Sequence, residues 1–127
     1  MRKIWIILII AAVLIAGLLF LRGNEDNWIT DDKGVYVKHG NPSQVPAYVI
    51  EQQEAIICAL DLYNKAKETT MLESQCLGAC GDYAVDIVHV PRTSEDDLAG
   101  NQCSAFKNGE LKHFIELDKD GNVVRIG

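Results

Sequence analysis

The strongest pattern in the sequence is an apolar run that begins at Ile4 and ends at Leu21, with no charged residue inside it. At about 1.5 Å per residue, a helix of this length spans about 27 Å. That is close to the thickness of the hydrocarbon core of a bilayer. The run also lacks the polar face of a helix that packs on a soluble core. The pattern predicts a transmembrane helix within residues 1–22.

A cleavable secretory signal is the alternative explanation of this run. Such a signal has a shorter apolar region that ends in small residues at an A-x-A-like site. Here Phe20, Leu21 and Arg22 end the run, and their side chains are too large for that site. The sequence therefore favours an uncleaved signal-anchor.

Residues 23–47 predict a short stalk, a small hairpin and a linker. Aromatic and β-branched side chains at 28–30 and 35–38 flank the turn-forming residues 31–34, which predicts the hairpin. A two-stranded hairpin is marginal alone, so it either packs on the main domain or is held loosely. Pro42 and Pro46 mark the linker.

Residues 48–127 predict one extracytoplasmic domain that opens with a helix ending near Glu68. Its apolar residues fall on one stripe of a helical wheel. The stripe consists of Ala55, Ile56, Ala59, Leu60, Leu62, Tyr63 and Ala66. Cys58 lies off this stripe, which suggests that it reaches a neighbouring segment through a disulfide.

The rest of this domain reads mainly as strands. After an irregular segment at 69–81, β-branched residues predict a strand at 83–90. Residues 103–107 and 110–118 flank Asn108-Gly109, a two-residue hairpin signal. A second turn at 118–122 leads to a last strand at 123–126.

Strands joined by tight turns are antiparallel. The sequence thus predicts an α+β fold with one helix packed on an antiparallel meander of about four strands. Ile87, Ile115 and Leu117 are expected to face the helix.

Charge sets the expected orientation. Arg2 and Lys3 precede the apolar run, Arg22 alone follows it, and acidic residues come next. The positive-inside rule therefore places the N-terminus in the cytoplasm and the domain outside the cytoplasm. All 18 acidic residues follow position 22, against 12 Lys and Arg of which three belong to the anchor, so the exported part carries formally −9. That charge argues against binding to nucleic acid or to an anionic membrane surface through nonspecific attraction.

Four cysteines lie in the exported part, at Cys58, Cys76, Cys80 and Cys103. An even number in a small exported domain favours two disulfides. Pairing Cys58 with Cys76 or Cys80, and Cys103 with the other, closes larger loops than a Cys76–Cys80 bridge. The alternatives are a zinc site, which usually shows two short-spaced pairs, and a redox pair, although the C-x-x-C spacing is absent.

Two further candidate sites are weaker. Cys80 as a nucleophile with His89 as its base, assisted by Asp86, requires contacts that the sequence does not encode, because Asp86 and His89 alternate to opposite faces of a strand. Residues 118–122 have the Asp and Asn of a calcium loop but lack the distal Glu, so a hairpin turn is favoured. We expect no metal ion and no cofactor.

The end of the 83–90 strand and the polar loop after it supply the candidate ligand-facing residues, because loops carry function more often than cores. These residues are His89, Arg92, Glu95, Asp96 and Asp97. The chain lacks a convergent catalytic set, which favours a small binding or accessory module at the cell envelope. Its expected partners are the membrane, through Ile4 to Leu21, and another envelope protein or a small ligand. The alternative is an extracytoplasmic enzyme or redox protein that uses Cys80 with His89.

One resemblance adds to this interpretation. After the anchor the sequence reads Trp28-Ile29-x4-Gly34-x-Tyr36-Val37-Lys38-His39-Gly40-Asn41-Pro42. This pattern resembles a juxtamembrane segment of uncharacterised single-pass, membrane-anchored, exported proteins of prokaryotes. The resemblance implies export and no known activity. A cysteine often follows the Ile in those proteins, but Thr30 stands here, so no disulfide is expected in this segment.

Overall fold

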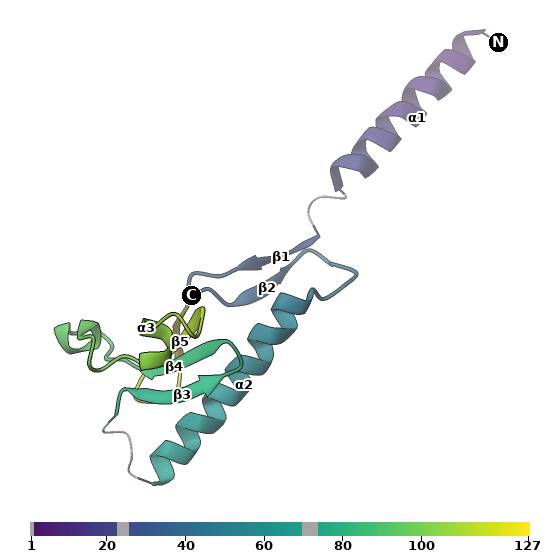
Figure 1. Cartoon of the computed structure of the whole chain (residues 1–127). Helices are drawn as coiled ribbons and strands as arrows, with labels where there is room; N and C mark the ends of the chain where they lie inside the picture. The colour runs from purple at the N-terminus through teal and green to yellow at the C-terminus, as the bar shows by residue number, and fades with distance from the viewer. Residues whose placement is uncertain (1, 23–25, 70–73) are drawn as a thin grey trace. The chain divides into compact units, whose positions relative to one another are not determined.

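The computed structural model describes residues 2–22, 26–69 and 74–127 (Figure 1). Residues 23–25 of the predicted stalk and 70–73 of the predicted irregular segment lie outside the described residues. The chain divides into two compact units, Met1–Ile29 with Val37–Val45, and Thr30–Tyr36 with Pro46–Gly127. The second unit, which we call the main domain, contains both disulfides and every candidate ligand-facing residue.

Helix α1 (Arg2–Arg22) contains the predicted span. Its stretch Arg2–Phe20 is long and apolar enough to cross a membrane. The large apolar side chains of this stretch are exposed, from 54% at Ile10 to 88% at Phe20. A helix that is apolar on all sides and has no protein cover suits a lipid environment by composition.

Strands β1 (Asn27–Thr30) and β2 (Tyr36–His39) form a two-stranded sheet, which confirms the predicted hairpin. Its tip belongs to the main domain. Gln52, buried on the following helix, accepts a hydrogen bond from the Tyr36 backbone N–H at 2.8 Å and donates to the Gly34 carbonyl at 2.9 Å. The tip is therefore fixed within the main domain, as one of the two alternatives for the hairpin expected.

Helix α2 (Ala47–Glu68) matches the predicted helix closely. It buries Val49, Gln52, Ala55, Ala59 and Tyr63. The last three of these residues lie on the predicted stripe, whereas Leu60 is 37% exposed. Figure 1 shows α2 running beside β3 and β4.

The four-stranded sheet of the main domain has the order β3-β4-β5-β6. Its strands are β3 (Cys76–Cys80), β4 (Tyr83–Ile87), β5 (His113–Leu117) and β6 (Val123–Ile126). The outer pairs are antiparallel, but β4 and β5 are parallel. The α+β class is confirmed and the predicted all-antiparallel meander is wrong. Residues 88–112 provide the long connection that a parallel pair requires, and we call this segment the crossover.

The prediction of a meander is wrong because Asn108-Gly109 does not form a hairpin turn. Ser104–Lys107 forms the short helix α3 instead of the predicted strand. The backbone N–H of Asn108 bonds to the Ser104 carbonyl at 2.8 Å, and Gly109, with a φ of +76°, bonds to the Phe106 carbonyl at 3.0 Å. A positive-φ glycine just after a helix is a common C-terminal stop, so the same dipeptide ends a helix here.

Strand β3 replaces part of the predicted irregular segment. Its residues, Cys-Leu-Gly-Ala-Cys, include no β-branched side chain, so strand propensity gave no signal. Pairing with β4 and a disulfide at each end hold it in the sheet. The disulfides are Cys58–Cys80 and Cys76–Cys103, which is one of the two pairings that loop size favoured over a Cys76–Cys80 bridge.

The two faces of the sheet differ in polarity. Paired residues in adjacent strands point to the same face. One row, Val85, Ile115 and Ile126, is buried and belongs to the apolar core with α2. The next row crosses all four strands and consists of Cys76, Asp86, Glu116 and Arg125. We call it the polar row. Cys58–Cys80 ties α2 to the apolar face, and Cys76–Cys103 ties the crossover to the polar row.

Replacing Gly34 with alanine is expected to destabilise the main domain more than Gly109→Ala does. Both glycines have positive φ, +85° and +76°, where a Cβ costs about 1–2 kcal/mol. A Cβ on Gly34 would also collide with the Ile126 carbonyl oxygen, whereas nothing lies within 4 Å of that position on Gly109.

We expect G34A to lower the free energy of unfolding by at least about 3 kcal/mol and G109A by about 1 kcal/mol. Urea unfolding of the full chain in detergent, followed by far-ultraviolet circular dichroism, measures both. Equal losses would contradict the packing of the hairpin tip on β6.

Candidate functional site

The parallel pairing of β4 and β5 brings two loops to one edge of the sheet. Ile87 and Leu117, the last residues of these strands, are Cα partners. The Val88 backbone N–H donates to the Leu117 carbonyl at 2.8 Å, which extends the pairing by one residue. Residues 88–101 and 118–122 therefore leave the sheet together, at the edge where ligands bind in sheets with parallel strands.

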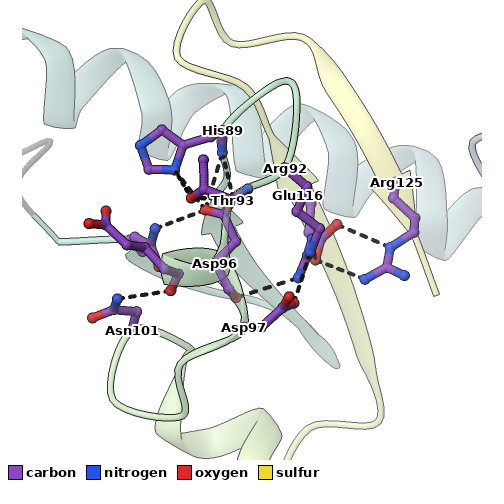
Figure 2. Close-up of polar contacts among 10 residues, drawn as sticks. His89, Arg92, Thr93, Asp96, Asp97, Asn101, Glu116 and Arg125 are labelled. Carbon is purple, nitrogen blue, oxygen red and sulfur yellow. Dashed lines mark hydrogen bonds and ion pairs between the residues drawn. The ribbon is translucent and has the colours of Figure 1, made fainter.

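Asp96 organises the first of these loops (Figure 2). It lies on the short 3-10 helix η1 (Ser94–Asp97) and is 2% exposed. Its carboxylate accepts hydrogen bonds from the backbone N–H of Thr93 at 2.8 Å and of His89 at 3.2 Å. Gln75 Nε2 donates to it at 3.0 Å, and His89 Nδ1 lies 2.9 Å away. Because a carboxylate only accepts, Nδ1 carries the ring proton.

These hydrogen bonds also set the charge of Asp96. Burial raises the pKa of this carboxyl, but the bonds from the Thr93 backbone and from His89 outweigh burial and lower the pKa from 3.8 to about 2. The carboxylate is charged at neutral pH. Its contribution to stability is present above pH 3.8 and is lost as the pH falls through about 2.

Glu116 of the polar row lies between two arginines (Figure 2). It is 7% exposed. Arg92 Nη1 donates to its Oε1 at 3.0 Å, and Arg125 donates from Nε and Nη2 at 3.1 and 3.0 Å. Arg92 also pairs with Asp97 at 3.0 Å. Two cations thus compensate one buried carboxylate, and charge-assisted bonds of this kind are strong.

Asp86, the neighbour of Glu116 in the polar row, is bonded to no arginine among the described residues. It is 9% exposed, and its Oδ1 accepts the backbone N–H of Cys103 at 3.1 Å. It lines a cavity of about 70 Å³ whose walls include Gln75, Arg92 and Arg125. One water needs about 10–15 Å³ of such space, so several waters have room beside Asp86.

The environment of Asp86 favours its neutral form. Burial raises the pKa, and the charge of Glu116 raises it further, while the Cys103 N–H and the charge of Arg92 lower it. The pKa rises from 3.8 to about 6. The polar row therefore contains a carboxyl group that exchanges a proton near neutral pH.

A groove of about 1100 Å³ lies at the shared edge of β4 and β5. Its walls come from the crossover and from the β5–β6 turn. Val90 and Leu98 are its most exposed apolar side chains, at 65% and 56%. His89, Glu95, Lys119 and Asp120 supply polar groups. The loop that carries the apolar pair is held by Asp96.

The candidate ligand-facing residues divide among these features. His89 and Glu95 line the groove. Arg92 and Asp96 line the small cavity, and the Asp96 side chain points inward to its hydrogen-bond donors (Figure 2). Asp97 is exposed and pairs with Arg92.

The structure does not bring Cys80 and His89 together. Cys80 is bonded to Cys58 and is 2% exposed, so it has no thiolate in this state. It pairs with Tyr83 at the start of β4, whereas His89 follows the end of that strand. Six residues at about 3.3 Å each separate the two positions by about 20 Å.

One group of described residues has metal-ligand spacing. Single ligand atoms of Cys76, Asp86 and Cys103 all lie within 4.8 Å of one another. The two sulfurs are bonded to each other, so they carry no charge for a metal ion. At the 118–122 turn, Asp118 accepts the backbone N–H of Asp120 and of Asn122 at 2.9 and 2.8 Å, which confirms the hairpin turn expected there.

Several residues of the polar row and the cavity were missed in the sequence. Glu116 and Arg125 face each other across the predicted β5–β6 hairpin, so its register was the signal that could have revealed them. Gln75 lies in a segment read as irregular and gave no signal.

Comparison of the chain with protein-family models, curated proteins and solved structures found no match.

The raised pKa of Asp86 predicts a dependence of stability on pH. Because the folded protein holds this proton more tightly than the unfolded chain, its free energy of unfolding should increase as the pH falls from 8 through 6 toward 4. A pKa raised from 3.8 to about 6 corresponds to about 3 kcal/mol.

Asp86→Asn keeps the acceptor for Cys103 and removes the titration. The difference in unfolding free energy between D86N and the wild-type chain should therefore change by about 3 kcal/mol between pH 8 and pH 4. Urea unfolding at several pH values measures it. Asp32→Asn, at an exposed turn, is the control and should show no such change. A pH-independent difference for D86N would contradict the assigned environment.

Proposed function

We propose that this chain is a membrane-anchored binding module that presents its groove outside the cytoplasm to another envelope protein. The observation that carries the proposal is the groove of about 1100 Å³ at the shared edge of β4 and β5. Pockets that bind ligands usually have volumes of about 300–1,000 Å³, so this groove accommodates a short polypeptide segment.

The construction of the groove supports a binding role. Val90 and Leu98 lie on a loop that the Asp96 carboxylate fixes through His89 and Thr93. Apolar side chains that stay exposed on a held loop lose little conformational entropy on binding. Grouped exposed apolar residues also tend to mark interaction sites.

The polar groups of the groove favour a segment with a basic residue beside an apolar one. Glu95 and Asp120 contribute two carboxylates, against one ammonium from Lys119. The exported part is acidic as a whole, so a basic segment is attracted at long range as well. His89 offers Nε2 as an acceptor in its neutral form, because Nδ1 donates to Asp96.

The proposed membrane anchor and the proposed extracytoplasmic location are supported by observations that do not involve the groove. Helix α1 has the length and composition of a span, and its large apolar side chains are exposed. Arg2 and Lys3 precede it, which favours a cytoplasmic N-terminus. All four cysteines form disulfides, which persist in oxidising compartments. The resemblance of the juxtamembrane segment to exported, anchored proteins points the same way.

A topology experiment tests the anchor. Alkaline phosphatase fused after Gly127 should be active in cells, because this enzyme requires an extracytoplasmic location. The fusion should remain with the membrane after a high-salt wash, at the mass of the uncleaved chain. Deletion of residues 2–20 should abolish phosphatase activity. An active fusion that is released at a smaller mass would show a cleaved signal and contradict the anchor.

Site-specific photocrosslinking tests the groove. A photoreactive phenylalanine analogue at Val90 or Leu98 should give discrete adducts in intact cells, because both side chains line the groove. The matched control is Ile57 on α2, which is 69% exposed and does not line it. Leu98→Asp should remove the adduct formed from position 90. Identical adducts from position 57, or none from the groove positions, would overturn the proposal.

A further inference from the structure

The disulfide Cys76–Cys103 has an acid beside it. The Asp86 carboxylate lies within 4.8 Å of both sulfurs. The same carboxylate accepts the backbone N–H of Cys103 at 3.1 Å, which fixes its position. Cys76 and Asp86 are Cα partners across β3 and β4, so their side chains project from the same face.

The second disulfide differs in this respect. Among the described residues, no side-chain oxygen or nitrogen of His, Asp or Glu lies within that distance of both sulfurs of Cys58–Cys80. That bridge connects α2 to the apolar face, with Cys58 partly buried and Cys80 2% exposed, and it lines a pocket of about 510 Å³ with Glu54 and His113. The chain thus contains two disulfides of similar loop size and burial, of which one has a carboxyl group within 4.8 Å of both sulfurs.

The two sulfurs of Cys76–Cys103 are unequal. Cys76 is only partly buried, whereas Cys103 is 2% exposed. Cys103 Sγ lies 3.4 Å from the Val85 carbonyl oxygen and 3.7 Å from the Gly78 carbonyl oxygen. Because Cys76 is the more accessible sulfur, access favours attack on Cys76 with Cys103 as the leaving group. A Cys103 thiolate at this buried position would face two partial negative charges, so its departure requires a proton as the disulfide opens.

We propose that Cys76–Cys103 exchanges with a dithiol of a partner protein, and that Asp86 donates the proton that Cys103 takes up as the disulfide opens. This activity is separate from binding in the groove. It assigns a chemical role to a buried acid that the proposed binding function does not use.

The exchange balances in two steps. A partner thiolate attacks Cys76 Sγ, the Cys76–Cys103 bond breaks, and Cys103 Sγ takes the electron pair and the proton of Asp86. The second partner thiolate then attacks the partner sulfur of the mixed disulfide, which releases the Cys76 thiolate. Cys76 takes a proton from solvent, and Asp86 regains one through the cavity. The partner loses two electrons and two protons and becomes a disulfide, and this chain becomes a dithiol.

The surroundings of Asp86 suit this proton transfer. The cavity of about 70 Å³ beside it has room for a chain of waters. Burial and Glu116 on β5 raise the pKa of Asp86, while the Cys103 N–H and Arg92 of the crossover lower it, with a result of about 6. Arg125 on β6 and Asp96 on η1 also line the cavity. A carboxyl group poised near neutral pH both donates and regains a proton.

The test measures how fast each disulfide is reduced in the full chain in detergent. Dithiothreitol is the dithiol probe, and thiols are blocked with a maleimide at each time point. Peptide mapping then follows both bridges in the same molecules. We expect Cys76–Cys103 to open at least tenfold faster than Cys58–Cys80 at pH 6. After correction for the thiolate fraction of the probe, its rate constant should decrease as the pH rises through about 6.

Asp86→Asn separates proton donation from structure. It keeps the acceptor for the Cys103 N–H, so D86N should slow the opening of Cys76–Cys103 about tenfold at pH 6 and remove the pH dependence. Asp32→Asn, at an exposed turn, should leave both unchanged. The wild-type comparison of the two bridges does not depend on either variant, so the test stands even where D86N fails to fold. Equal rates for the two bridges, a flat wild-type profile, or a D86N profile identical to the wild type would overturn the proposal.

Discussion

The fold of the main domain depends on holding β3, a five-residue edge strand, in place. Its sequence offers Gly78 and Ala79 at the centre and little side-chain packing to stabilise a strand. Disulfides at Cys76 and Cys80 compensate for this, one on each face of the sheet. With sequence separations of 27 and 22, each is worth about 3–4 kcal/mol in the chain-entropy model. That is a large share of the stability of a small domain, so α2, the sheet and the crossover are all connected through this one strand.

The polar row follows from the same arrangement. A sheet covered by α2 on one face leaves its other face to the crossover, and the side chains there include Asp86 and Glu116. Glu116 is compensated by Arg92 and Arg125, as buried charges usually require. Asp86 instead accepts one hydrogen bond from the backbone N–H of Cys103. Its pKa rises to about 6. A buried acid that is bonded to no cation among the described residues lowers stability at neutral pH, and groups with perturbed pKa values cluster at functional sites.

The sequence predicted the parts of this structure that local pattern determines. The helical stripe gave α2, the Asp-rich turn at 118–122 gave the β5–β6 hairpin, and loop-size entropy disfavoured a Cys76–Cys80 bridge without choosing between the two remaining pairings. Tertiary context decided the rest. Asn108-Gly109 ends a helix because a long connection, rather than a turn, joins β4 to β5. Gln75 and β3 have no pattern of their own, since pairing and disulfides place them. The sequence named His89 and Glu95 as candidate ligand-facing residues. It could not show that Asp96 is buried, because this depends on hydrogen bonds from His89, Thr93 and Gln75.

The groove and the Cys76–Cys103 disulfide are built from adjoining residues. Gln75 donates to Asp96, which fixes the loop with Val90 and Leu98, and the next residue, Cys76, binds the far end of the crossover at Cys103. The crossover is thus attached to the start of β3 twice, once by a hydrogen bond near η1 and once by a covalent bond before α3. Arg92 also attaches the crossover to β5, through its hydrogen bond to Glu116. The hydrogen bonds of Asp96 and Arg92 do not involve sulfur, so the proposed binding groove and the proposed disulfide exchange rest on separate supports within the crossover.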